Sequence, residues 1–229
     1  MSEHIYTIII NTAFEASAAE NAPPCCPLCA VRDKLAANEL ERILGAAMME
    51  PSVRIETNRS GFCRPHYDEL LSAGNRLGLA LILESHLAEV ERRLRGGKAT
   101  DRAADMQLSC YLCERLDKSF PQVLNNAVHM WKSDPDFRRK LSAQKMLCLP
   151  HYAQLAEAAA RSLDKRLRGD FADALRAIVD KYMTELREDV SLFIKKFDYR
   201  FDDLPWGTSK DSPERAARFL SGSRFKSQV

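Results

Sequence analysis

Apolar residues recur every three or four positions along most of the chain, which is the spacing of helices with one buried face. Residues 31–48 and 112–131 show this pattern, and the longest example runs from Phe171 to Phe197. Residues 4–10 alternate in polarity and are rich in β-branched side chains, as strands are. No second segment offers a strand partner. We therefore expect an all-α fold with an extended N-terminal arm laid on helices.

Several segments between these patterns give further predictions. Residues 77–83 are apolar on every side, which is typical of a helix at the centre of a molecule. Gly74-Asn75 precedes them and predicts a break in the helix. Residues 51–61 are polar and end in glycine, so they predict a loop, and residues 98–108 are typical of a linker. Gly169-Asp170 predicts the start of the long C-terminal helix.

Cysteine and histidine form one pattern that occurs twice. A CxxC motif is followed by a CxPH motif, and both return later in the chain at nearly the same spacing. The eight residues are Cys26, Cys29, Cys63, His66, Cys110, Cys113, Cys148 and His151. Such repetition predicts two units of one design. We place repeat one at residues 25–97, ending in Gly96-Gly97, and repeat two at 98–169, between an arm over 1–24 and a C-terminal region over 170–229.

Three thiols and one imidazole are the closed ligand set of a structural zinc site. We expect each repeat to bind one Zn²⁺ through its own four ligands, so that the ion joins two helix starts across a loop. Four protein ligands leave no open position for a substrate, which favours structural over catalytic ions. Iron–sulfur clusters are the main alternative. A c-type haem is excluded, because Ala30 and Glu114 stand where its signature needs histidine.

The remaining polar candidates receive simpler interpretations. Six of the seven cysteines belong to the repeated pattern, which in a reducing compartment favours metal over disulfides. Cys25 is the seventh, and we expect a spectator because Ser109 replaces it in repeat two; a reactive thiol is the alternative. Each zinc site would carry a charge of about −1, which Arg64 is placed to offset. His86 and His129 lie in predicted helices and are expected to be structural.

Composition and charge narrow the function classes. A hydrophobic content of 45% is enough for a sizeable core, and a net charge of +2 gives no general attraction to nucleic acid or membranes. The N-terminus has no basic segment, and its apolar run is too short for a signal peptide. The longest later apolar run is far short of a membrane span. We therefore expect a soluble cytoplasmic protein without a membrane partner.

The C-terminal tail mixes aromatic, basic and acidic residues, among them Tyr199, Arg200 and Trp206. Such mixing can bind single-stranded nucleic acid, but the acids favour a tail docked on the body. We expect the working surface to be a groove between helices, closed at one end by the tail and fitted to a protein or small ligand. The sequence shows no phosphate-binding loop, nucleophile triad or carboxylate pair.

These observations favour a zinc-binding helical protein that acts as a binding or scaffold module. An iron–sulfur or thiol redox protein is the first alternative, and an enzyme with a pocket between helices is the second.

Four features stand out beside the helical pattern: Glu3-His4-Ile5-Tyr6, residues 75–80, the two CxxC and CxxH pairs, and Phe197-Asp198-Tyr199-Arg200. In these features the chain resembles an uncharacterised bacterial family of unknown function, and the resemblance covers nearly the whole chain. Some similar proteins carry an automatic label of transporter substrate-binding protein, which the expected lack of an export signal argues against. The resemblance implies the same eight metal ligands and no catalytic residue.

Overall fold

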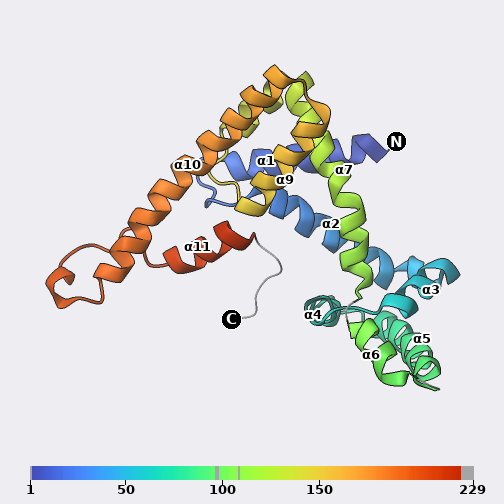
Figure 1. Cartoon of the computed structure of the whole chain (residues 1–229). Coiled ribbons are helices and arrows are strands. Elements are labelled where there is room, and N and C mark those ends of the chain that lie inside the picture. The colour runs from blue at the N-terminus through green and yellow to red at the C-terminus, as the bar shows by residue number, and fades with distance from the viewer. Residues whose placement is uncertain (1, 96–97, 108, 223–229) are drawn as a thin grey trace. The chain divides into compact units, whose positions relative to one another are not determined.

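The computed structural model describes residues 2–95, 98–107 and 109–222 (Figure 1). These residues form α-helices and two short 3-10 helices, with no strand among them, which confirms the all-α prediction. The elements are α1 (Ser2–Ala18), α2 (Pro27–Leu44), η1 (Ala46–Met49), α3 (Pro51–Ser60), α4 (Arg64–Ser72), α5 (Arg76–Leu94), α6 (Ala99–Gln107), α7 (Tyr111–Ser133), α8 (Pro135–Ser142), α9 (Leu149–Ser162), α10 (Lys165–Lys195), η2 (Tyr199–Phe201) and α11 (Ser212–Ser221). No helix in this described part is both long and apolar enough to cross a membrane.

Contacts divide the chain into two compact units, named here by their place in the sequence. The terminal unit comprises Met1–Val31 and Pro121–Val229, and the central unit comprises Arg32–Phe120. The unit boundaries fall inside α2 and α7. These boundaries differ from those predicted from the repeat. The repeat divides the sequence into consecutive segments, whereas the terminal unit combines two segments that are distant in the sequence.

The N-terminal segment belongs to the core of the terminal unit. Ile10 and Phe14 lie one turn apart on α1 and are almost fully buried. The ring of Phe14 packs 4.9 Å from that of Phe137 on α8, and the Gln144 side chain donates to the Phe14 carbonyl. The predicted extended arm over residues 1–24 is therefore wrong. Burial of one helical face outweighs the strand preference of the β-branched residues here.

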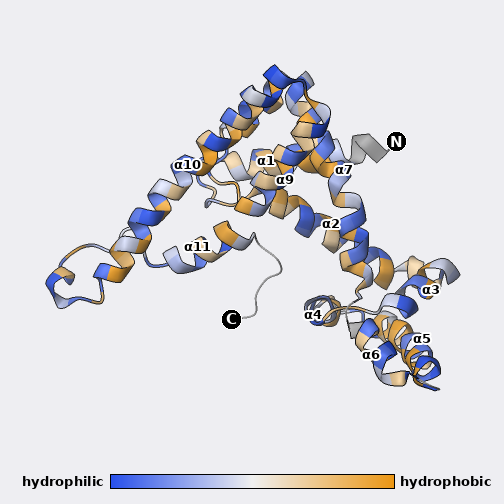
Figure 2. Cartoon of the chain, in the orientation of Figure 1, coloured by the Kyte–Doolittle hydropathy of each residue, from blue (hydrophilic) through white to orange (hydrophobic). Residues whose placement is uncertain are grey.

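The long helix α10 also belongs to the terminal unit and buries one face there. Its buried residues recur along one face, and Figure 2 shows apolar and polar residues interleaved along it. The helix begins at Lys165, where the Asp164 side chain caps it by accepting from the Leu167 amide. The predicted start at Gly169-Asp170 is wrong, because both residues lie inside the helix and Asp164 is the N-cap.

The last helix, α11, packs against α9 and α10. Its Phe219 is buried, with the ring 5.5 Å from that of Tyr182 on α10. Arg215 bonds Asp189 of α10 at 2.6 Å, and both side chains are largely buried. Helix α11 is thus part of the folded terminal unit.

The central unit contains two short helices that the sequence pattern did not predict. Residues 51–60 form α3, which starts with a proline in its first turn and buries Val53, Thr57 and Ser60. Residues 99–107 form α6, which packs against α5. The prediction of a loop at 51–61 is wrong, because polar composition concealed a short helix held by tertiary contacts. The link between the repeats predicted at 98–108 stays a prediction.

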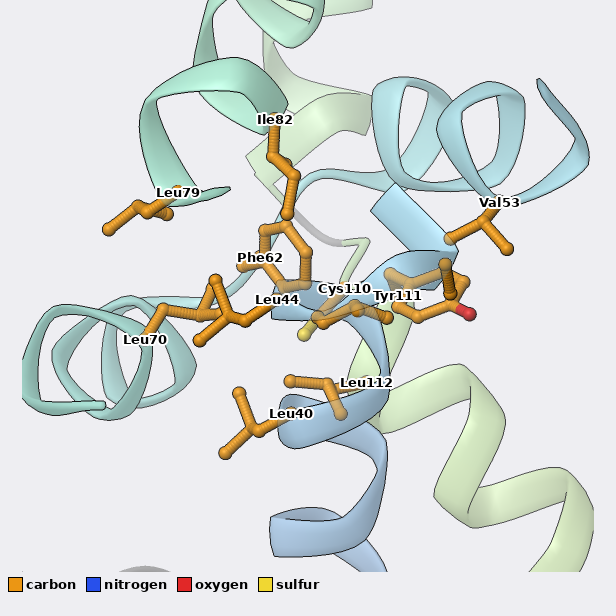
Figure 3. Close-up of a cluster of buried hydrophobic side chains, with 12 residues drawn as sticks. Leu40, Leu44, Val53, Phe62, Leu70, Leu79, Ile82, Cys110, Tyr111 and Leu112 are labelled. Atoms are coloured by element: carbon orange, nitrogen blue, oxygen red, sulfur yellow. The ribbon is translucent and has the colours of Figure 1, made fainter. Parts of the chain in front are cut away.

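The core of the central unit surrounds Phe62. Figure 3 shows Phe62 pointing into a cluster that includes Ile82 of α5, Leu44 of α2 and Cys110. The rings of Tyr67 and Tyr111 pack 5.5 and 6.1 Å from that of Phe62. This apolar cluster therefore includes a residue of the repeated cysteine pattern.

Only one face of residues 77–83 is covered within this unit. Leu79 and Ile82 are buried, whereas Leu77 is 71% exposed. The prediction that this helical segment is buried on every side is therefore wrong. The predicted helix break is confirmed: Gly74 has a φ of +82°, and the Asn75 side chain caps α5 by accepting from the Gly78 amide. The expected end of repeat one at Gly96-Gly97 lies outside the described residues.

Candidate metal centres

Each of the four repeated motifs lies at the N-terminus of a helix. Its first cysteine directly precedes the helix, and its second ligand follows in the first turn. Backbone bonds from the i+4 amide to the carbonyl of Cys26, Cys63, Cys110 and Cys148 fix all four turns at 2.9–3.2 Å. Proline occupies an early position of α2, α4 and α9, where no amide hydrogen is needed. The positive end of each helix favours negative charge on the sulfurs.

The eight residues form two clusters, each within one compact unit. Site A lies in the terminal unit and contains Cys26, Cys29, Cys148 and His151. Site B lies in the central unit and contains Cys63, His66, Cys110 and Cys113. In each site the four ligand atoms lie within 4.8 Å of one another.

This grouping corrects the prediction that each repeat supplies all four ligands of its own site. Site A combines the CxxC motif of repeat one with the CxPH motif of repeat two, and site B combines the other two motifs. The ligand types are the same under either pairing, because both give one CxxC with one CxPH. The motif at the start of α2 thus meets the motif at the start of α9, and the motif at the start of α4 meets that at the start of α7.

The distances in site A fit one tetrahedral ion. The Nδ1 atom of His151 lies 3.4 Å from both Cys26 Sγ and Cys29 Sγ, and 3.2 Å from Cys148 Sγ. The sulfurs of Cys29 and Cys148 are 3.7 Å apart. Zinc bonds of about 2.3 Å to sulfur and about 2.0 Å to nitrogen imply about 3.8 Å between sulfurs and about 3.5 Å between sulfur and nitrogen.

Site B has nearly the same geometry. His66 Nδ1 lies 3.2 Å from both Cys63 Sγ and Cys110 Sγ, and 3.6 Å from Cys113 Sγ. The sulfurs of Cys63 and Cys113 are 3.9 Å apart. Both ligand sets therefore suit a metal ion of the size of zinc.

The thiols of site A differ in how readily they ionise. Hydrogen bonds from Cys148 and Cys26 strongly lower the pKa of Cys29, while burial raises the pKa of Cys26 well above its usual range. For Cys148, a hydrogen bond with Cys26 lowers the pKa, but the hydrogen bond with Cys29 and burial outweigh it and raise it to about 12. One thiolate is favoured, and the other two thiols hold their protons at neutral pH.

Site B shows the same division of charge. The hydrogen bond from Cys113 lowers the pKa of Cys110 to about 3. That bond in turn raises the pKa of Cys113, and burial raises the pKa of Cys63. A divalent ion would stabilise all three thiolates and displace the protons of the other two thiols.

The two sites differ in what covers them. All four ligands of site A are buried, whereas Cys63 and Cys113 of site B are only half-buried. A methyl group placed on Gly222, the C-cap of α11, would lie 3.6 Å from Cys148 Sγ and 3.8 Å from Cys29 Sγ. Gly222 has a φ of +75°, which favours glycine, whereas the two distances are those of ordinary van der Waals contact. The end of α11 therefore lies against the sulfurs of site A.

A hydrogen-bonded group supports site B from the side of α2. Glu39 accepts two bonds from Arg42, at 2.9 and 2.7 Å, and one from the Tyr111 hydroxyl at 2.8 Å. Burial, together with the bond to Glu39, raises the pKa of Tyr111 to about 12. Tyr111 directly follows the ligand Cys110, so this group fixes the start of α7. The sequence pattern gave no sign of it, because Tyr111 lies 72 positions from Glu39 in the chain.

Other predicted residues lie apart from these clusters or take other roles. Cys25 is exposed beside Cys26 and is not among the site A ligands. The Arg64 guanidinium pairs with Asp68 at 2.8 Å. His86 Nδ1 lies 2.9 Å from the Asn58 carbonyl, and His129 is exposed on α7.

The predicted groove between helices remains a prediction. A hollow of about 410 Å³ lies over α2 and η1 in the central unit, and Glu41, Arg42 and Glu50 are among its lining residues. These charged side chains make it unlike an apolar ligand pocket.

Comparison with known proteins places the chain in a family. No curated protein and no solved structure matches it significantly. The model of one family matches two overlapping segments, residues 1–106 and 95–227, and each segment contains one CxxC and one CxPH motif. This double match fits the internal repeat, and together the two segments cover nearly the whole sequence. The chain belongs to the family of unknown function DUF6062.

Proposed function

We propose that this chain is a zinc-stabilised helical protein that acts as a binding or scaffold module in the bacterial cytoplasm. The observation that carries the proposal is the closed ligand set of each site, in which three sulfurs and one nitrogen surround a gap fitted to one ion. Such a site has no open position for a substrate. The ions would therefore stabilise the fold, and recognition would take place elsewhere on the surface.

Zinc is the proposed metal because the ligand atoms of each site lie within 4.8 Å of one another. An iron–sulfur cluster spreads its ligands over several iron atoms and so holds many of them farther apart. The cytoplasm is proposed from the cysteines, because clustered thiols outside disulfides are typical of a reducing compartment. The bacterial source is proposed from the family resemblance.

Elemental analysis tests the metal assignment. Protein purified without added metal should contain two equivalents of zinc per chain and should be colourless. A protein without zinc or iron would contradict the proposal. A brown protein with broad visible absorbance would establish the iron–sulfur alternative instead.

The proposed recognition surface is the segment after α10. Phe197 is 76% exposed and Tyr199 is 84% exposed. The segment is nevertheless well held, because the Lys196 ammonium donates to the carbonyls of Phe201, Asp202 and Leu204 at 3.1, 2.6 and 3.0 Å. Exposed aromatic residues on an ordered segment are typical of protein contact sites. The acids Asp198, Asp202 and Asp203 make a protein partner more favourable than nucleic acid.

Site-specific photocrosslinking tests this surface. A photoreactive residue at position 199 should give a discrete crosslinked protein species in cells. The same residue at the exposed Arg176 of α10 is the matched control and should give none. Equal crosslinking at both positions, or none at position 199, would contradict the assignment.

A further inference from the structure

The two metal sites differ in access to solvent although their ligands are of the same types. In site B, Cys110 and His66 are buried, but Cys63 and Cys113 are half-buried. These two come from different helix starts, α4 and α7, and their sulfurs lie 3.9 Å apart. A small oxidant could therefore reach a pair of neighbouring sulfurs in site B.

Site A is protected by burial and by α11. All its ligands are buried, and the end of α11 at Gly222 lies against Cys148 and Cys29. Helix α11 is held in place by the buried Phe219 ring and by the ion pair of Arg215 with Asp189. Loosening of α11 is therefore the expected route for a reagent to the sulfurs of site A.

We propose that site B is a peroxide-sensitive site, in which formation of a Cys63–Cys113 disulfide releases the ion. This inference rests on the proposed function, since it requires metal at both sites. One thiolate attacks the O–O bond of a peroxide and becomes a sulfenic acid, and the first oxygen leaves as water after taking a proton. The second thiolate then attacks that sulfur to form the S–S bond, and the second oxygen leaves as water with another proton.

The electrons and atoms of this reaction balance. The two sulfurs lose two electrons, and hydrogen peroxide with two protons is reduced to two water molecules. The ion loses two of its four ligands and can leave. The new disulfide joins the same two helix starts that the ion joined, so α4 and α7 stay linked while the charge at their N-termini changes. The result is a switch of site B rather than unfolding of the unit.

The test uses full-length protein loaded with two zinc ions. Hydrogen peroxide is added in the presence of a chromogenic zinc chelator, and the disulfide is mapped by mass spectrometry after alkylation of free thiols. The expected result is rapid release of one equivalent of zinc, with a Cys63–Cys113 disulfide, and at least tenfold slower release of the second. Reductant and zinc should restore the starting state. Release of both ions at one rate, no release, or a disulfide between other cysteines would overturn the proposal.

Two full-length variants keep the result interpretable. Cys25→Ser removes the exposed thiol beside site A and should leave both release rates unchanged; loss of the rapid phase would overturn the proposal. Phe219→Ala loosens α11 and should speed release from site A while site B stays the same. If zinc release from site A remains as slow as in the unchanged protein, shielding by α11 does not explain why the two sites release zinc at different rates. Absence of metal before oxidation would instead contradict the proposed function.

Discussion

Sites A and B share their ligand types and have similar distances but differ in their surroundings. Site A is buried beneath the end of α11 in the terminal unit, whereas two of the cysteines of site B are only half-buried in the central unit. The comparison separates two properties of a metal site. The ligand set determines whether an ion binds, and the surrounding structure determines how readily reagents reach it.

The largest expected effect comes from removing one ion. Cys148→Ser should eliminate the ion of site A and destabilise the terminal unit, and Cys113→Ser should do the same for site B and the central unit. Structural zinc contributes on the order of 10 kcal/mol in small zinc peptides. Site A joins residues 119 positions apart and site B residues 44 apart, so loop closure adds about 0.9 kcal/mol to the effect at site A.

Hydrogen exchange, read separately for the two units, measures this effect. Each variant should lose protection mainly in the unit that contains its site. Loss of protection in both units from either variant would show that the two sites do not act independently.

The next largest effect is expected at the cover of site A. Phe219→Ala removes a buried ring and should lower the free energy of unfolding of the terminal unit by about 3–5 kcal/mol. Leu220→Ala is the matched control, because Leu220 is 60% exposed and its loss should cost little. Chemical denaturation measures both. Similar losses in the two variants would contradict the docking of α11.

The pH dependence of metal binding should be steep at both sites. Two thiols per site have a raised pKa and hold protons at neutral pH, so zinc must displace about two protons at each site. Affinity should therefore rise with pH and fall by up to about 100-fold per unit as pH decreases. Calorimetry in buffers of different ionisation enthalpy counts the protons. A pH-independent affinity would contradict the charge distribution described here.

A smaller effect is expected beside site B. Tyr111→Phe removes the hydroxyl that donates to Glu39 and should destabilise the central unit by about 1 kcal/mol. Tyr199→Phe is the control, since its side chain is 84% exposed. Thermal unfolding distinguishes them. Equal stability of the two variants would show that the group around Glu39 does not support site B.

The all-α fold and the eight clustered residues could be predicted because both depend on local pattern. Helical periodicity identified most of the long helices, and the spacing of CxxC and CxPH identified the eight candidate metal ligands. Short polar helices such as α3 and α6 escaped prediction, because tertiary contacts rather than composition hold them. The same applies to α1, whose burial of Ile10 and Phe14 overrides a strand-like sequence.

The pairing of the motifs could not be predicted from sequence. Each repeat offers the same two motifs, so pairing within and between repeats gives identical ligand sets. The cover of site A could not be predicted either, although glycine is a typical residue at the C-terminus of a helix. Its approach to Cys148 and Cys29 requires the fold of the whole terminal unit.

Metal content of two double variants tests the crossed pairing most directly. Cys29→Ser with Cys148→Ser removes two ligands of site A, and Cys29→Ser with Cys63→Ser removes one ligand from each site. The structure predicts that the first variant retains one zinc per chain and the second retains none. If the first retains none and the second retains one, each repeat binds its own ion and the crossed arrangement is contradicted.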